Sequence, residues 1–355
     1  MLGNPSERNL KQTINCGENP MHTPVDNHDR PEDPVTHRVT CRQTNTTEQR
    51  PEAAPFITLM GNDSMDTSIE HNHNAPGAEP GRRRYSRRQL EELLPSLKER
   101  DLQILAAIRQ CRFFTSQQVC RLIFLGQVPS TANTRAANRN LKKLRELNLI
   151  AVVEHSRGGV KGGSSTIVWY LTEAGERLLR LADHDKSERR SRVVDPSKRF
   201  IRHTLAVAEC SMQIREICAR HDGLTLEALE LEPTCWRPYT HIGKVVSLKP
   251  DLYALTLCGE YEDRWFIEVD LATESISAII DQCCRYHEYY RSGLEQEEFG
   301  VFPLTVWIVP SNARRDALKD AIRKTFDKLA PLFAVITPEE LEPLLTQELS
   351  REALC

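Results

Sequence analysis

The spacing of apolar residues divides the chain into stretches that can fold and stretches that cannot. Residues 1–81 are rich in Asn, Thr, Pro and His and have almost no periodic apolar positions. Such a segment buries too little surface to offset the entropy lost on ordering, so we expect a disordered tail there. Further along, apolar residues recur at helical spacing and predict helices over 99–111, 119–124 and about 131–148.

A short two-stranded pattern follows these helices. Residues 150–153 and 166–170 are apolar runs rich in β-branched and aromatic side chains, which predicts two strands. Their connection holds four glycines together with Arg157 and Lys161, so a flexible backbone and positive charge coincide at the hairpin tip. A further helix is expected next, and the charged, apolar-poor segment 184–198 predicts a linker.

The predicted helix over 131–148 has an apolar face and a basic face. Apolar residues on the first face recur at i, i+4 and i+7 and would pack against the two preceding helices. The other face carries side chains that can contact phosphates and bases: Arg135, Asn138, Arg139, Lys142 and Lys143. Over residues 82–145 the chain has 15 Lys and Arg against 4 Asp and Glu, a net charge of +11, whereas the whole chain carries −3. This imbalance favours a nucleic-acid partner.

The order helix, helix, basic helix, hairpin and helix over residues 82–183 resembles a winged-helix domain of the helix-turn-helix group. The resemblance implies that the basic helix docks in the major groove of double-stranded DNA, with Arg157 and Lys161 of the wing near the phosphates. The five arginines within 82–88 would form an arm that binds phosphate, and a solvated segment leading into the fold is the alternative. Some winged helices bind protein instead, and the sequence leaves that alternative open.

The second half of the chain alternates helices with strands. The pattern predicts, in order, a helix over 199–221, strands over 225–231 and 245–248, a hairpin over 249–270, a helix from Thr273 or Ser275 to about Tyr290, a buried strand over 304–309, a helix over 312–329 and an edge strand over 333–336. We therefore expect an α/β domain over 199–340 and a tail over 341–355. Together with the first domain this predicts an α+β multidomain protein.

Three carboxylates are expected to meet at one end of the predicted hairpin. Glu268 and Asp270 lie two residues apart on the returning strand, so their side chains leave the same face. A turn near Tyr261 places Asp251 opposite them or within a pair or two. Carboxylates this close repel one another unless a proton or a cation lies between them. Mg²⁺ or Mn²⁺ would suit the site, and ordinary carboxylates at strand ends are the structural alternative.

The ordered residues of this region resemble a nuclease superfamily. They are Pro250-Asp251, Glu268-x-Asp270 and Gln282-x-x-x-Tyr286. This set resembles the PD-(D/E)XK superfamily over about residues 199–335, and its last element is similar to nuclease domains of RecB type. The resemblance implies catalytic roles for Asp251, Glu268, Asp270, Gln282 and Tyr286. It also implies a metal held by Asp251 and Glu268, with His203 of the preceding helix as a candidate ligand.

One position departs from the superfamily pattern. The third motif residue is normally a Lys that positions the attacking water, and Asp270 stands there instead. Lys249, Lys244 and Arg285 are the nearest cations in sequence, and none is at the expected place. Whether the domain is a metal-dependent endonuclease or nickase, or binds a metal without cutting, stays open. A restriction-type nuclease needs the intact Lys and is the least favoured of the enzymatic alternatives.

The chain as a whole, over about residues 97–340, resembles the replication-relaxation family of plasmids and other mobile elements. In that family Glu-x-Asp without the Lys is the usual form. The resemblance implies a DNA-binding protein of plasmid replication or relaxation, with plasmid DNA and a replication initiator or relaxase as partners. The alternative is a winged-helix regulator of transcription or copy number whose nuclease-like domain is inactive.

The remaining composition restricts the setting. Eleven cysteines include no Cys-x-x-Cys pair and no paired Cys/His spacing, which argues against zinc. The sequence has no signal-peptide pattern and no stretch approaching 18 apolar residues, so we expect a cytoplasmic protein without a membrane partner. The oligomeric state stays open, a dimer included.

Overall fold

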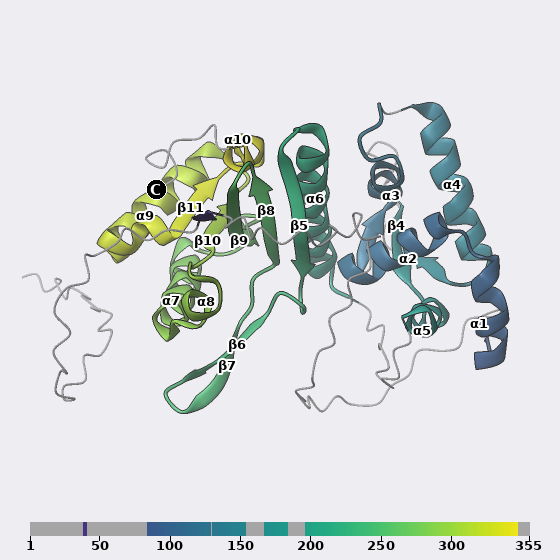
Figure 1. The fold of residues 1–355 in the computed structure, drawn as a ribbon, viewed down its shortest axis with the longest axis horizontal. Coiled ribbons are helices and arrows are strands. Elements are labelled where there is room, and N and C mark those ends of the chain that lie inside the picture. Colours follow the sequence, from purple (N-terminus) through teal and green to yellow (C-terminus); the bar gives the residue numbers. More distant parts are fainter. Residues whose placement is uncertain (1–37, 41–83, 129, 154–166, 184–195, 347–355) are drawn as a thin grey trace, which may run out of the picture. The chain divides into compact units, whose positions relative to one another are not determined.

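Helices and strands alternate through the computed structural model, which describes residues 38–40, 84–128, 130–153, 167–183 and 196–346 (Figure 1). The fold is a mixture of helices and strands, which agrees with the α+β class predicted from the sequence. Three predicted segments lie outside the described residues: the N-terminal tail apart from 38–40, the linker apart from 196–198, and the loop with Arg157 and Lys161. Within the described residues no helix is long and apolar enough to cross a membrane.

The helical part of the chain contains the three helices expected from periodicity. Its elements are α1 Arg87–Leu93, a 3₁₀ turn Leu94–Ser96, α2 Glu99–Cys111, β2 Phe113–Thr115, α3 Ser116–Ile123, α4 Thr131–Glu146, β3 Ile150–Val152, β4 Val168–Leu171 and α5 Glu173–Ala182. Thr115 caps α3 as predicted, since its hydroxyl accepts from the Gln118 amide at 3.1 Å. Strand β2 was not predicted and completes a three-stranded antiparallel sheet in the order β2-β4-β3.

Helix α1 differs from the sequence expectation. Arg87 and Arg88 were expected in an extended basic arm, but a capping box between Ser86 and Gln89 begins a helix at this point. Both arginines are then paired along the helix surface, with Glu91 and Glu92 at 2.9 Å each. These two arginines are therefore part of a helix with its own ion pairs.

The second part of the chain is built on a five-stranded sheet in the order β11-β10-β9-β8-β5. Its strands are β5 Leu224–Leu231, β8 Leu252–Cys258, β9 Tyr261–Val269, β10 Leu304–Ile308 and β11 Phe333–Ile336. The first three pair antiparallel, and β9, β10 and β11 pair parallel. The three-residue strand β1, Arg38–Thr40, pairs with the beginning of β9. The predicted hairpin, buried strand and edge strand are confirmed.

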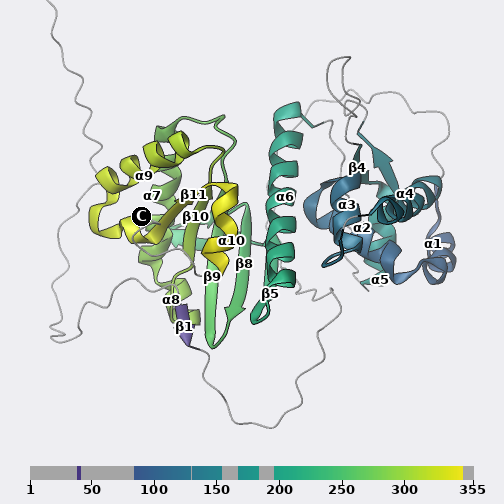
Figure 2. The ribbon, with the colours of Figure 1, turned by 90° about the horizontal axis from the view of Figure 1, so that it is seen from above.

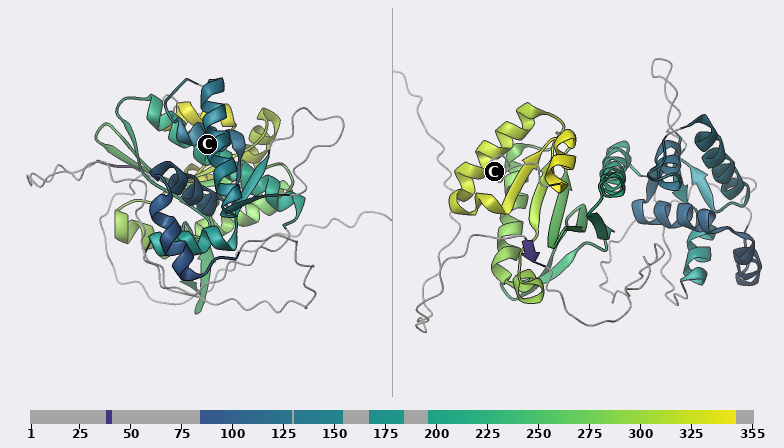
Figure 3. Two further views of the ribbon diagram at one scale, coloured as in Figure 1. Left: turned by 90° about the vertical axis from the view of Figure 1, so that its right-hand side faces the viewer. Right: turned by 45° about the horizontal axis from the view of Figure 1, so that its top comes forward.

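Helices cover both faces of this sheet (Figures 2 and 3). Alternate residues of β9 point to opposite faces, so Trp265 and Ile267 join the core with α6 Lys198–Arg220 and α10 Leu341–Leu345, while Phe266 joins the core with α7 Ile276–Ser292 and α9 Asn312–Phe326. The short helix α8, Leu294–Phe299, follows α7. Ser275 is the cap of α7, one of the two predicted alternatives.

Two boundaries differ from the predictions. Residues 341–345 were expected in a tail, but they form α10, whose Leu341, Leu344 and Leu345 are buried in the core that α6 shares. The helix predicted over 312–329 ends at Phe326, where a 3₁₀ turn Asp327–Leu332 begins. Asp327 has φ 43° and ψ −108°, outside the helical region, so the α-helix ends before it.

A two-stranded ribbon interrupts the sheet domain between β5 and β8. Strand β6, Arg237–His241, pairs antiparallel with β7, Lys244–Leu248, and neither strand joins the large sheet. Only the second strand was predicted. Pro238 within the first strand weakened the strand signal, because proline is confined to edges and two-stranded pieces.

Candidate functional site

The β8–β9 hairpin places Asp251 across from Glu268. Leu252 lies opposite Ile267, and one more pair in that register brings the two carboxylates to the same end of the hairpin. The Asp251 side chain is fixed there, because the Val269 amide donates to its Oδ2 at 2.8 Å. Glu268 is only 7% exposed and points toward α7, on the face that Phe266 also occupies. The sequence predicted this juxtaposition from a hairpin turn near Tyr261.

Glu268 lies in surroundings that disfavour its charge. Burial raises its pKa well above the usual value, the Asp251 charge raises it further, and the Tyr286 hydroxyl opposes the shift by donating a hydrogen bond at 2.6 Å. Burial and the Glu268 charge in turn raise the pKa of Tyr286 well above its usual value. The pair of carboxyl groups thus holds a proton more tightly than an isolated carboxyl does.

His203 reaches the site from the second turn of α6. Its Nε2 lies 3.0 Å from the Asp251 Oδ1, and this hydrogen bond raises the pKa of the histidine above 6.5. The resemblance implied that His203 is a candidate metal ligand, and that role stays a prediction; in the structure the imidazole is hydrogen-bonded to Asp251 and orients its carboxylate. Its positive form is favoured next to the carboxylate.

Asp270 has a different set of partners from those predicted for it. Its Oδ2 accepts from the Arg314 Nε at 2.7 Å, and its Oδ1 accepts from the Ala272 amide at 2.8 Å. The same guanidinium donates from Nη2 to the Glu274 carbonyl at 2.7 Å. Asp270 thus holds the turn from β9 to α7 against α9, and its place in a metal shell with Asp251 and Glu268 stays a prediction.

Sequence reasoning missed Arg314. It lies on the first turn of α9, 44 residues after its partner, and its pairing depends on how α9 crosses the end of the sheet. The nearest signal is the Ser311 cap, which fixes where the helix starts and therefore where Arg314 points. The Ser311 cap places Arg314 at the start of a helix, but it does not identify Asp270 as the partner of Arg314.

The other predicted site residues lie at different distances from the pair. Tyr286 is hydrogen-bonded to Glu268, whereas Gln282, one turn earlier on α7, is half-buried and forms no hydrogen bond with either carboxylate in the described part of the chain. Lys249, a candidate for the missing motif lysine, lies with its Nζ 4.4 Å above the Trp236 ring. Arg285 is exposed on α7.

Asp251 and Glu268 offer carboxylate oxygens, the ligands that hard divalent cations such as Mg²⁺ and Mn²⁺ take. Within the described residues no group of three His, Cys, Asp or Glu side chains is arranged to hold one metal ion. Mg²⁺ is commonly held by one or two carboxylates, with water and phosphate oxygens completing its shell. Asp251 and Glu268 supply that number, and their mutual repulsion is what a cation would relieve.

The basic face of α4 is the second candidate surface. Arg135, Asn138, Arg139 and Lys142 are exposed, as the helical spacing predicted. Neither Arg135 nor Arg139 has an ion-pair partner among the described residues, and Lys142 lies 3.9 Å from Glu146. Lys143 differs from the others, because its Nζ binds Asp101 of α2 at 2.6 Å.

The Lys143–Asp101 contact has a structural role. Asp101 is 2% exposed, and its Oδ2 also accepts from the Lys98 amide at the start of α2 at 3.0 Å. Lys143 supplies the opposite charge that a buried carboxylate needs, so it fixes α4 to α2. The basic face available to a partner therefore consists of the other four residues, and it is named the α4 basic face below.

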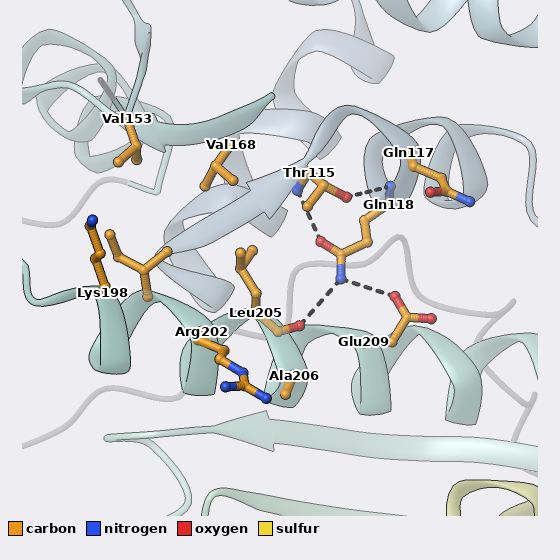
Figure 4. A pocket seen from close by; sticks show the side chains of 11 residues that line it. Thr115, Gln117, Gln118, Val153, Val168, Lys198, Arg202, Leu205, Ala206 and Glu209 are labelled. Carbon is orange, nitrogen blue, oxygen red and sulfur yellow. Dashed lines mark hydrogen bonds between the residues drawn. The ribbon is translucent and has the colours of Figure 1, made fainter. Parts of the chain in front are cut away.

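A hollow of 540 Å³ lies between β2, the start of α3 and α6 (Figure 4). Apolar side chains of Val168, Ile201 and Leu205 line it together with polar Gln118 and Glu209. Gln118 spans the gap, since its Nε2 donates to the Glu209 Oε2 at 3.0 Å. None of the lining residues belongs to the carboxylate pair.

Comparison with known proteins gives one match. The family described as Replication-relaxation matches residues 105–305, more than half of the chain, from within α2 to within β10. The match includes the α4 basic face, Asp251, Glu268 and Tyr286. No curated protein and no solved structure matches the chain.

Proposed function

Since the chain belongs to the replication-relaxation family, we propose that it is a DNA-binding protein of plasmid or mobile-element replication. In this proposal residues 82–183 are a winged-helix domain that docks α4 in the major groove of double-stranded DNA. The sheet domain is a PD-(D/E)XK nuclease-like domain whose carboxylate pair binds Mg²⁺ or Mn²⁺. A replication initiator or relaxase is the protein partner that such a role calls for.

The arrangement of elements supports both domain identifications. Helices α2, α3 and α4 followed by strands β3 and β4 and helix α5 give the element order of a winged helix. In the second half, α6, β5, β8, β9, α7 and β10 follow the order α-β-β-β-α-β expected of the nuclease superfamily, with the β6–β7 ribbon as an insertion.

The α4 basic face is the observation that carries the proposal. Its side chains are exposed and held on a rigid helix whose opposite face is buried through Ala137, Leu141 and Leu144. No Asp or Glu occurs from residue 113 to residue 145, so the potential along this surface is not offset by neighbours in sequence. Exposed arginines on one helix face can contact phosphates and base edges together.

The test is the affinity of Arg139→Ala for labelled duplex DNA, measured by fluorescence anisotropy over a range of salt concentrations. We expect roughly tenfold weaker binding, about 1.4 kcal/mol, and a salt slope reduced by about 1 if the lost contact is to a phosphate. Arg323→Ala, which removes an exposed arginine paired with Asp320 on α9, is the matched control and should bind as the wild type does. Equal affinities of all three proteins at low salt would refute the role of α4.

The carboxylate pair supports the nuclease-like part of the proposal. Val269 and His203 orient the Asp251 carboxylate, and Tyr286 orients that of Glu268, so both groups are fixed before any ligand binds. A divalent cation bound there would act as a Lewis acid on a phosphoryl oxygen. Tyr286 and His203 would then maintain the positions of the two carboxylates, and Glu268 would release its proton when the cation binds.

Calorimetric titration with Mn²⁺ tests this part, with wild type compared with Glu268→Ala and with plasmid nicking followed in parallel. We expect binding that releases protons in the wild type and at least tenfold weaker binding in the variant, because one of two anionic ligands is lost. Binding together with nicking of supercoiled plasmid would establish an enzyme. Equal heats for both proteins would remove the metal from the proposal.

A regulator without nuclease activity is the second candidate, and one observation favours it. Asp270 stands where the superfamily normally has the motif lysine, and its carboxylate is paired with Arg314. The nearby Lys249 lies over the Trp236 ring. No cation positioned for the attacking water is thus found at the pair within the described residues. Metal binding without nicking in the titration above would select this candidate.

A further inference from the structure

The β6–β7 ribbon ends in a turn whose sequence is unfavourable for its shape. His241 pairs with Lys244, so Ile242 and Gly243 alone form the turn. Both have positive φ, 47° and 69°, as a type I′ turn requires. Asn-Gly is the favoured pair in such turns, and a β-branched residue at positive φ is strained. A large apolar side chain is thus kept at the tip against the local preference of the backbone.

Apolar side chains are exposed at this end of the ribbon. Ile242 is 87% exposed, and Val245 and Val246 on β7 are 59% and 37% exposed. Because neighbouring residues of a strand point to opposite faces, the ribbon presents apolar surface on both sides as well as at the tip. A lone exposed apolar residue needs no explanation, but three within five positions mark a contact surface.

Charge identifies the kind of partner. The 18 residues from Pro233 to Pro250 include no Asp or Glu, while they include two lysines, an arginine and a histidine. Arg237 at the base is paired with Glu230, which leaves exposed Lys244 beside the tip. An apolar tip flanked by positive charge and without acidic residues is complementary to a polyanion. A second copy of the same ribbon would bring like charges together.

We propose that the β6–β7 ribbon binds duplex DNA, with Ile242 inserted as an apolar wedge between base steps in the minor groove and Lys244 beside the phosphates. Apolar side chains inserted in this way unstack a base step and bend the duplex. The inference rests on the proposed function in that DNA is the partner, but it uses a surface separate from α4. Strand β7 ends three residues before Asp251, so the ribbon and Asp251 belong to one continuous stretch of chain.

The base of the ribbon is held independently of its tip. Tyr239 on β6 is buried, and its ring lies 5.2 Å from that of Tyr289 on α7. Cys235 and Leu248, at the two ends of the ribbon, are also buried in the core shared with α7. A substitution at residue 242 therefore leaves the anchoring contacts unchanged.

The test compares wild type with Ile242→Asn by anisotropy and by end-to-end fluorescence energy transfer in a doubly labelled duplex. Asn at this position creates the favoured Asn-Gly turn, so the melting temperature should be equal to or higher than that of the wild type. We expect roughly fivefold to tenfold weaker binding and loss of the bend at saturating protein. Leu294→Asn, which removes an exposed apolar side chain from α8, is the matched control and should keep both properties.

The outcomes separate this inference from the proposed function. Wild-type protein that fails to bind duplex DNA would refute both. Binding that depends on Arg139 but is unchanged in affinity and bend by Ile242→Asn would refute only the ribbon. A variant that changes sedimentation behaviour while its DNA binding stays the same would show that the ribbon is a contact between copies, and would equally overturn the inference.

Discussion

The α4 basic face and the Asp251–Glu268 pair differ in how far their charged groups are exposed to solvent. Arg135 and Arg139 extend into solvent, where a charge costs nothing to keep and is available to a partner. The carboxylates are largely withdrawn from solvent, and each is held by named neighbours: Asp251 by His203 and Glu268 by Tyr286. Substitutions on α4 should thus change binding and leave stability alone, whereas substitutions around the carboxylates should change stability even without a ligand.

The same contrast separates two carboxylates on one strand. Burial and the neighbouring Asp251 raise the pKa of Glu268, while Asp270, two residues later, is paired with Arg314. Of the three carboxylates at this end of the hairpin, Asp270 is thus the one that already has a guanidinium partner. A cation would gain most from Asp251 and Glu268.

The largest expected effect is that of Arg314→Ala. Its removal leaves Asp270, whose side chain is 4% exposed, as a buried charge without its partner, and such changes cost about 3–5 kcal/mol. Urea denaturation monitored by circular dichroism measures the loss. Arg87→Ala is the matched control, because it breaks an exposed Arg–Glu pair at a similar distance and should change stability by less than about 0.5 kcal/mol.

The double variant Arg314→Ala/Asp270→Ala sharpens this test. Removing both partners eliminates the uncompensated charge, so the double variant should be more stable than Arg314→Ala alone. Similar losses for Arg314→Ala and Arg87→Ala would mean that the Asp270 pair is as solvated as a surface pair. The distinction between the two regions would then fail at this residue.

The sequence predicted those parts of the fold that depend on local periodicity. The helical repeat gave the α4 basic face, and the hairpin turn predicted near Tyr261 gave the meeting of Asp251 with Glu268. Caps at Thr115 and Ser275 were readable because the capping side chain and the amide it binds are three residues apart. The i, i+4 spacing likewise put Gln282 and Tyr286 on one face, although only Tyr286 contacts Glu268.

What the sequence did not predict depends on contacts between distant residues. Lys143 has the same helical spacing as the exposed cations, and only the approach of α2 assigns it to Asp101. Arg314 is assigned to Asp270 by the way α9 crosses the sheet end. His203 faces Asp251 for the same kind of reason, because the packing of α6 brings together two residues that are 48 positions apart in sequence.

The smaller expected effect is the pH dependence that Glu268 confers on the free energy of unfolding in the absence of divalent cations. Its pKa is raised in the folded protein, so the folded state binds the proton more tightly than the unfolded state does. That contribution to stability is fully present below the unfolded pKa, near 4.3, and is lost as pH rises through the folded pKa. Gln at this position imitates the protonated form, keeps an acceptor for Tyr286 and can donate to Asp251.

We therefore expect Glu268→Gln to match the wild type near pH 4 and to be more stable at pH 8, by about 1–3 kcal/mol, the usual penalty for a buried polar group without full compensation. Urea denaturation in EDTA across this pH range measures the difference. Added Mn²⁺ should narrow the gap by stabilising only the wild type, since the cation binds the ionised pair. If the free energies of unfolding of both proteins changed with pH in parallel, the folded and unfolded states would bind the Glu268 proton equally. Folding would then disfavour the charge of the carboxylate pair no more than it disfavours the exposed charges of α4.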